Sequence, residues 1–214
     1  IIMKSIFSHL KIPQVNFFII QDENLDDKNN LKIICDQIIK KLNFPLFIKP
    51  ANSGSSIGIS KVVNQSEILG ALQKAWSIDH RIIVEEGLEV KELEVGIIGR
   101  TKLIASEVGE VNYLSDWYDY DSKYKSKNKI TIPAKINNNL REKIKTLSIQ
   151  SCMALNINKF ARVDFFLEKG TDKIYLNEIN TIPGFTSNSM FPLLWQSSGL
   201  EIDELIAKLI EYSL

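Results

Sequence analysis

Two stretches near the C-terminal end decide the fold: Phe160-Ala-Arg-Val-Asp-Phe-Phe-Leu167 and Lys173-Ile-Tyr-Leu-Asn-Glu-Ile-Asn180. Both are short and rich in apolar and aromatic residues, and the turn 168–172 separates them, which predicts a strand pair. Side chains two residues apart share one face of a strand, so Arg162 lies beside Asp164, and Glu178 lies beside Asn180 at the end of the second strand. The residues of the first strand that must face the core alternate with these: Ala161, Val163 and Phe165.

The polar residues on this strand pair predict a metal site. Two carboxylates, Asp164 and Glu178, converge with the amide of Asn180, and Mg²⁺ prefers such oxygen ligands together with phosphate oxygens. The alternative is an ion pair of Arg162 with Asp164 or Glu178. Burying so many charges costs several kcal/mol per ion unless a metal or ligand compensates, which favours the metal.

The rest of the chain predicts an α+β fold, because hairpins of strands are mixed with helices. A joint near Glu86-Gly87 divides a small lobe, 1–86, from a larger one, 87–214. Helices are expected over 1–10, 31–42, 66–76 (capped by Ser66) and 138–154, and after residues 188 and 201. Further strands are expected over 47–49, 57–63, 81–85, 91–98 (half-buried) and 102–107. The first helix has no capping residue before it. We therefore expect that the given sequence starts within this helix and that part of the protein precedes it.

Composition excludes several classes of protein. Lys plus Arg and Asp plus Glu are both 26, so no net charge attracts nucleic acid or an anionic membrane. No apolar stretch has the length of a spanning helix. The two cysteines, Cys35 and Cys152, form no CxxC motif, which argues against a zinc site or a disulfide framework and suits a cytosolic protein. His9 and His80 belong to no recognisable catalytic triad.

Four other segments carry candidate chemistry. Lys49 ends a strand before the small-residue loop 51–56, and together they could hold phosphate, although no Walker A motif is present. Glu85 and Glu86 lie at the expected joint, where nucleotide clefts tend to form. The polar segment 109–129, which contains Tyr118-Asp-Tyr-Asp-Ser-Lys-Tyr124, has the length and composition of a functional lid. The turn Pro183–Ser189 could bind a substrate carboxylate. Each alone is more often a plain loop or a solvated surface than a functional site.

In this order and spacing, the segments closely resemble the D-alanine–D-alanine ligase family of ATP-grasp enzymes. The matching set is Ile48-Lys-Pro, Gly54-Ser-Ser-Ile-Gly58, Glu85-Glu-Gly-Leu88, Asp119-Tyr-Asp-Ser-Lys-Tyr124, Ala161-Arg-Val-Asp164 and Asn177-Glu-Ile-Asn-Thr-Ile-Pro-Gly-Phe-Thr186. The resemblance covers nearly the whole chain. It implies the ATP-grasp fold, two α+β lobes with mixed or antiparallel sheets and the nucleotide between them.

The resemblance also implies residue roles. The ATP-binding residues would be Lys49, Ser53, Ser55, Ser56, Glu85, Glu86, Leu88, Glu92 and Lys123. Asp164, Glu178 and Asn180 would hold two Mg²⁺ or Mn²⁺ ions. Tyr124 and Ser55 would tie the lid to the site, and Arg162, Gly184 and Ser189 would orient two D-alanines. Tyr124 favours D-alanine as the second substrate.

The implied reaction is the ATP-dependent synthesis of D-alanyl-D-alanine through D-alanyl phosphate, for bacterial peptidoglycan. Family members carry a further N-terminal domain that is absent from this sequence, so we expect this chain alone to bind ATP with little or no turnover. Two rival interpretations stay open here, another ATP-grasp carboxylate–amine ligase and a truncated non-catalytic remnant. The expected location is the cytoplasm, and no nucleic acid or membrane partner is expected. Whether the protein forms a homodimer stays an open question.

Overall fold

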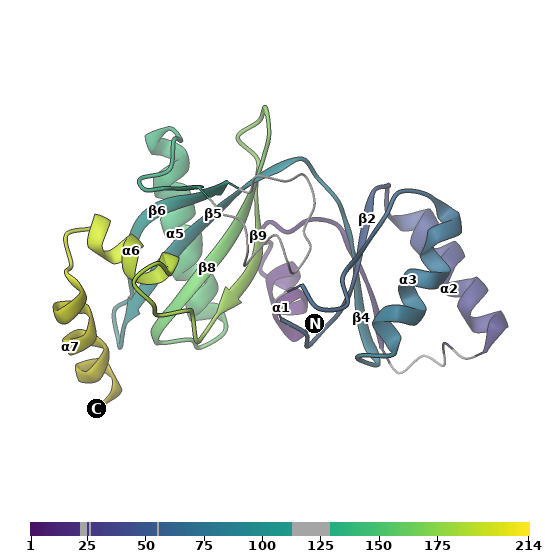
Figure 1. The fold of residues 1–214 in the computed structure, drawn as a ribbon, viewed down its shortest axis with the longest axis horizontal. Coiled ribbons are helices and arrows are strands. Elements are labelled where there is room, and N and C mark those ends of the chain that lie inside the picture. Colours follow the sequence, from purple (N-terminus) through teal and green to yellow (C-terminus); the bar gives the residue numbers. More distant parts are fainter. Residues whose placement is uncertain (22–24, 26, 55, 113–128) are drawn as a thin grey trace. The chain divides into compact units, whose positions relative to one another are not determined.

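A computed structural model of the 214-residue chain describes residues 1–21, 25, 27–54, 56–112 and 129–214 (Figure 1). The chain forms two compact units. The first spans Val15–Leu88, and the second contains Ile2–Gln14 together with the described residues from Glu89 onward. The first helix therefore packs with the second unit, whereas the division into 1–86 and 87–214 placed it in the first lobe.

The first unit is a four-stranded antiparallel sheet with two helices. The strands are β1 (Phe17–Gln21), β2 (Leu46–Pro50), β3 (Ser60–Val62) and β4 (Arg81–Glu86), in the order β1-β4-β2-β3. Helices α2 (Lys28–Lys41) and α3 (Gln65–Trp76) lie on the same side of this sheet (Figure 1). Apolar side chains of both helices, among them Ile38 and Leu72, meet Ile48 and Val84 of the central strands in one buried core.

The start of α3 differs from the prediction, which made Ser66 the cap. The N-cap is Asn64, whose side chain accepts a hydrogen bond from the backbone N–H of Ser66 at 3.1 Å. The Glu67 carboxylate in turn accepts from the backbone N–H of Val63 at 2.8 Å and from the Asn64 amide at 2.8 Å. Asparagine caps as well as serine, and Glu67 completes a reciprocal arrangement, so the helix begins at Gln65.

The second unit is a five-stranded antiparallel sheet covered on both faces. Its strands are β5 (Val90–Gly99), β6 (Ile104–Asn112), β7 (Lys129–Thr131), β8 (Lys159–Glu168) and β9 (Ile174–Asn180), in the order β7-β6-β5-β8-β9. Helices α1 (Ile2–His9) and α5 (Asn138–Ala154) pack on one face, through Phe7 and Ile144 against Val95 and Val163. Helices α6 (Met190–Ser197) and α7 (Ile202–Ser213) lie on the other (Figure 1).

The two strands β5 and β6 differ from what their sequences predict. Strand β5 is fully buried from Leu93 to Gly99 rather than half-buried, because helices cover both of its faces. Strand β6 extends to Asn112, so the first residues of the predicted polar segment 109–129 belong to the sheet. Residues 113–128 of that segment, with Lys123 and Tyr124, lie outside the described residues, as does Ser55.

A β-bulge in β6 faces Gly96 of β5. Val95 pairs with Val108 and Ile97 pairs with Ala105, which leaves two residues of β6, Ser106 and Glu107, opposite the single Gly96. The Ser106 hydroxyl accepts a hydrogen bond from the Gly96 backbone N–H at 2.8 Å. Such bulges redirect a side chain away from its expected face.

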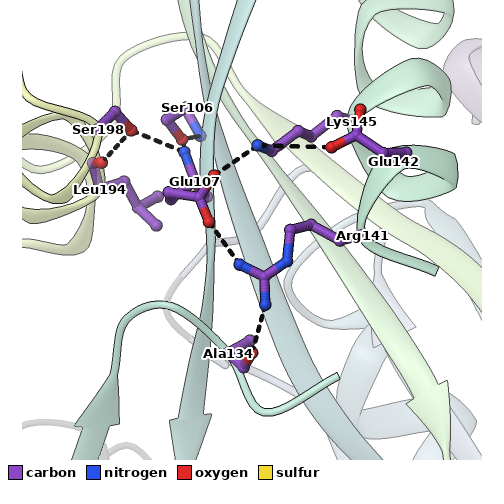
Figure 2. Close-up of polar contacts among 9 residues, drawn as sticks. Ser106, Glu107, Ala134, Arg141, Glu142, Lys145, Leu194 and Ser198 are labelled. Atoms are coloured by element: carbon purple, nitrogen blue, oxygen red, sulfur yellow. Dashed lines mark hydrogen bonds and ion pairs between the residues drawn. The ribbon is translucent and has the colours of Figure 1, made fainter. Parts of the chain in front are cut away.

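Glu107 joins the sheet to α5 through its redirected side chain and to the end of α6 through its backbone (Figure 2). Its carboxylate lies 2.5 Å from Arg141 and 2.5 Å from Lys145, both on α5. Its backbone N–H donates to the Ser198 hydroxyl at 2.7 Å. Burial raises the pKa of the Glu107 carboxyl, but hydrogen bonds and charge from Lys145 and Arg141 outweigh burial and hold that pKa below its ordinary value.

Candidate functional site

Strands β8 and β9 bring the four predicted polar residues together. Arg162 pairs with Asn180, and Asp164 pairs with Glu178, two positions apart in the antiparallel ladder. Directly opposite side chains share a face, so all four lie on one side of the sheet. The prediction that Ala161, Val163 and Phe165 face the core is confirmed, since all three are buried.

Within this cluster, Arg162 and Asp164 form a two-point ion pair. The Arg162 Nε donates to Asp164 Oδ1 at 2.7 Å, and Nη2 donates to Oδ2 at 2.8 Å. The Asn180 amide donates to Asp164 Oδ2 at 2.9 Å and lies 3.4 Å from Glu178 Oε1. The ion pair that the sequence offered as the alternative to a metal is therefore present.

A third carboxylate, Glu94 on β5, completes the surroundings of Arg162. Its Oε2 lies 2.8 Å from Arg162 Nε. Sequence reasoning missed Glu94, which lies within the strand predicted over 91–98 as half-buried. The sequence feature that could have pointed to Glu94 is a carboxylate between two apolar residues, Leu93 and Val95. Only the order of the strands in the sheet shows that its neighbour is Arg162.

Negative charge exceeds positive charge in the cluster. Burial lowers the pKa of the Arg162 guanidinium, but the hydrogen bond to Asp164 and the charges of Asp164, Glu94 and Glu178 outweigh burial and raise that pKa above its ordinary value. Three carboxylates thus surround one guanidinium. The excess of carboxylate suits a site that receives a cation.

The chemistry of the donor set fits a divalent cation. Asp164 and Glu178 offer carboxylate oxygens on paired positions, and Asn180 offers an amide oxygen if its side chain turns over, as Mg²⁺ requires. Among the described residues, no three acidic, histidine or cysteine side chains are already arranged around a metal position. Both Asp164 oxygens already accept hydrogen bonds, so an ion would compete there with the Arg162 guanidinium and the Asn180 amide. The two predicted metal ions stay a prediction.

In the first unit, Lys49 is ion-paired with Glu85. The two residues lie on neighbouring strands β2 and β4, and the Glu85 side chain is 5% exposed whereas that of Lys49 is 24% exposed. The Lys49 ammonium is therefore the more exposed partner of the ion pair. An anion could contact it in place of Glu85 or together with Glu85. The predicted phosphate contact of Lys49 and adenine contact of Glu85 stay predictions.

Glu86, predicted beside adenine, uses its carboxylate within the fold. Its oxygens accept hydrogen bonds from the Asn16 side chain at 2.8 Å and from the Asn43 backbone and side chain at 2.8 and 2.9 Å. The side chain thus ties β4 to the segments before β1 and after α2. Any contact with a nucleotide would fall to the Glu86 backbone. For Leu88, and for Glu92 of β5, the predicted contacts with adenine and ribose stay predictions.

The base of the small-residue loop is anchored, and its end needs glycine. Asn52 donates from its backbone and side chain to Asp79 Oδ2 at 3.0 and 2.7 Å. Gly58 has a φ of +78°, and a Cβ there would come within 2.5 Å of Ile78 and 2.7 Å of Pro50. Ser53 and Ser56 lie between these two points and are half-buried, and their predicted contacts with phosphate stay predictions.

The predicted substrate turn places Gly184 beside Ser189. A Cβ on Gly184 would lie 3.0 Å from Ser189 Oγ, so the absence of a side chain leaves this hydroxyl room. Ser189 Oγ accepts a hydrogen bond from the Thr186 backbone N–H at 3.0 Å and lies 2.8 Å from the Thr186 hydroxyl. The structure therefore joins these two predicted substrate residues, and their roles stay predictions.

Comparison with known proteins matches this arrangement. The family described as "D-ala D-ala ligase C-terminus" matches residues 6–211. The D-alanine–D-alanine ligases of Prochlorococcus marinus strains MIT 9301 and MIT 9215 are 65% and 64% identical to this chain over 214 residues, all of the chain and 60% of each relative. The chain thus spans about 60% of the length of these relatives.

Solved structures agree in fold. The VanG D-Ala:D-Ser ligase of Enterococcus faecalis superposes with a TM-score of 0.86 at 32% identity, over 99% of this chain and 60% of that one. The D-alanine–D-alanine ligase of Coxiella burnetii gives 0.80 at 26% identity, over 99% and 55%. The α+β ATP-grasp fold that the sequence predicted is confirmed, and the antiparallel sheets are those of the described chain. The chain belongs to the D-alanine–D-alanine ligase family, whose C-terminal region it matches.

Proposed function

We propose that the protein takes part in the ATP-dependent joining of two D-alanines to D-alanyl-D-alanine, a precursor of bacterial peptidoglycan, in the cytoplasm. The observation that carries the proposal is the group of Arg162, Asp164, Glu178 and Asn180 on paired positions of β8 and β9. Family membership supports the same reaction, because relatives that are 65% identical over the whole chain bear this ligase name.

Phosphoryl transfer to a carboxylate depends on positioning and charge neutralisation. Bound divalent cations, two in number, would supply Lewis-acid neutralisation of the phosphate oxygens. Asp164, Glu178 and Asn180 would hold them. Lys49 would hold the phosphates of ATP, and Lys123 would approach the γ-phosphate. The first D-alanine carboxylate would then take the γ-phosphoryl group, giving D-alanyl phosphate and ADP.

The second D-alanine amine would attack the carbonyl of D-alanyl phosphate, and phosphate would leave. Arg162 would stabilise the oxyanion that develops on this carbonyl, a contact worth roughly 10²–10³ in rate. Gly184 and Ser189 would orient the substrate, and Tyr124 would connect the lid with Ser55. The functional halves would be the ATP-grasp subdomains 1–86 and 87–214, except that the first helix packs with the second of them. The remaining ATP contacts would come from the residues already named: Ser53, Ser56, Glu85, Glu86, Leu88 and Glu92.

Calorimetry of ATP binding tests the proposal. With Mg²⁺ present, the wild-type chain should bind ATP, and Glu178→Ala should weaken this binding about tenfold or more, the scale seen when a metal site loses supporting groups. Glu168→Gln is the matched control, because it removes a carboxylate from the far end of β8, where Glu168 faces Lys173 at 3.5 Å. Equal Mg²⁺-dependent binding by wild type and Glu178→Ala would remove the assigned cation site.

A further inference from the structure

Glu94 is a buried carboxylate to which no step of the proposed reaction gives a role. It lies on β5, directly opposite Asp164 of β8, and its side chain is 9% exposed. A carboxylate at this depth is retained only when charged partners compensate for its lost hydration. Its cationic partner among the described residues is Arg162, the residue expected at the reacting carbonyl.

Two carboxylates lie beside the Nε of that arginine, and its one N–H is hydrogen-bonded to Asp164. Arg162 Nε lies 2.7 Å from Asp164 Oδ1 and 2.8 Å from Glu94 Oε2, so the two anions flank the same donor. Only Asp164 also takes Nη2, at 2.8 Å. The pair is therefore unequal: Asp164 accepts two hydrogen bonds from the guanidinium, whereas Glu94 Oε2 contributes a negative charge beside Nε.

The fold limits where the guanidinium can go. Gly96 faces Arg162 across β5 and β8, and the space above Gly96 is filled by Trp195 of α6. A Cβ on Gly96 would lie only 2.7 Å from Trp195 Nε1. Since directly paired residues share a face, Trp195 bounds Arg162 on the Gly96 side, and the guanidinium reaches toward Asp164 and Glu94.

We propose that Glu94 is a positioning residue, which keeps the Arg162 guanidinium in place when Asp164 turns from Arg162 to a divalent cation. The inference rests on the proposed function, in which Asp164 is a cation ligand. With Asp164 engaged elsewhere, Glu94 is the carboxylate left beside Nε and takes over its N–H, and Nη2 is released toward substrate. A guanidinium fixed at Nε keeps its planar fork pre-organised for an oxyanion.

Hydrogen exchange at Arg162 Nε, followed by NMR without metal or nucleotide, tests this. Asp164→Asn stands in for the state in which Asp164 no longer provides its charge. In wild type, Glu94→Gln and Asp164→Asn, the Arg162 Nε–H should exchange about tenfold or more slowly than that of exposed Arg100, since a charge-assisted hydrogen bond is worth at least that factor. In the double variant only neutral amide oxygens remain to accept the hydrogen bond, so the protection should fall well below that of either single variant. Arg162→Lys assigns the signal.

The outcomes separate cleanly. Protection that is lost in Asp164→Asn alone, or that persists in the double variant, overturns the role of Glu94. If the double variant does not fold, Asp164→Asn with Glu94→Asp replaces it, because the shorter side chain withdraws the carboxylate from Nε. Glu168→Gln, on the same strand as Arg162, should leave the protection unchanged. The measurement uses no ATP, so failure of the calorimetric test and failure of this one are distinguishable.

Discussion

The interaction of Glu107 with Arg141 and Lys145 makes a strong prediction about stability. Glu107→Gln removes the charge that both cations approach at 2.5 Å and leaves those cations next to each other (Figure 2). Side-chain exposure is 23% for Glu107 and 18% and 20% for its partners, so the triad lies between the surface and the interior. Surface pairs contribute about 0.2–1 kcal/mol, and breaking a buried pair costs about 3–5 kcal/mol.

Because the triad lies between these two limits and the substitution breaks both ion pairs at once, we expect a destabilisation of roughly 2–4 kcal/mol at pH 7. For a chain of this size that corresponds to a fall in Tm of roughly 4–16 °C. Urea unfolding followed by circular dichroism measures the free energy. The matched control is Glu142→Gln. Glu142 lies 3.9 Å from the same Lys145 but is 73% exposed, so its loss should cost under about 0.5 kcal/mol.

The pH dependence of the Glu107 effect has a definite sign. The folded-state pKa of Glu107 is lowered from 4.5, so its stabilising contribution is complete above that value and is lost as pH falls through the folded pKa. The difference between wild type and Glu107→Gln should therefore be constant from pH 7 to 5 and shrink in more acidic solution. A difference under about 1 kcal/mol at pH 7, or one that grows on acidification, would refute the reasoning.

Two further outcomes follow from local packing. Gly96→Ala should destabilise the chain by about 1–3 kcal/mol, because its Cβ would meet Trp195 Nε1 at 2.7 Å and Ser106 Oγ at 3.3 Å; unfolding midpoints measure this, and an unchanged midpoint contradicts it. Cys152 is fully buried, and burial raises the pKa of its thiol to about 12, so in native protein at pH 8 a thiol reagent should leave it unmodified until denaturant is added. Mass spectrometry of labelled peptides locates the modification, and labelling of Cys152 before unfolding contradicts the assignment.

Much of the fold could be predicted because it depends on local periodicity. The helix predicted over 138–154 is α5, Asn138–Ala154, and the strands around Arg162 and Glu178 lie where their apolar alternation placed them. The prediction was wrong for β5, which its alternation of Glu92 and Glu94 with apolar residues made half-buried. Local alternation reports on one covered face, and it cannot show that α6 covers the other.

The contacts of the candidate site were likewise predictable only where they depend on local spacing. That Arg162 and Asp164 share a face follows from their spacing, since neighbouring side chains of a strand alternate. That Glu86 binds Asn16 and Asn43 could not be predicted, because these partners are 70 and 43 residues away in the chain.

The sequence by itself determined the helices and most strands, the alternation of core and polar faces, and, through its ordered motifs, the family. Tertiary structure alone decided which strands are neighbours, and therefore that Glu94 lies against Arg162 and that Glu107 turns toward α5. The physical reason is range: backbone geometry relates residues two to four apart, whereas a hydrogen-bonded register and a bulge depend on a partner strand that no local pattern specifies.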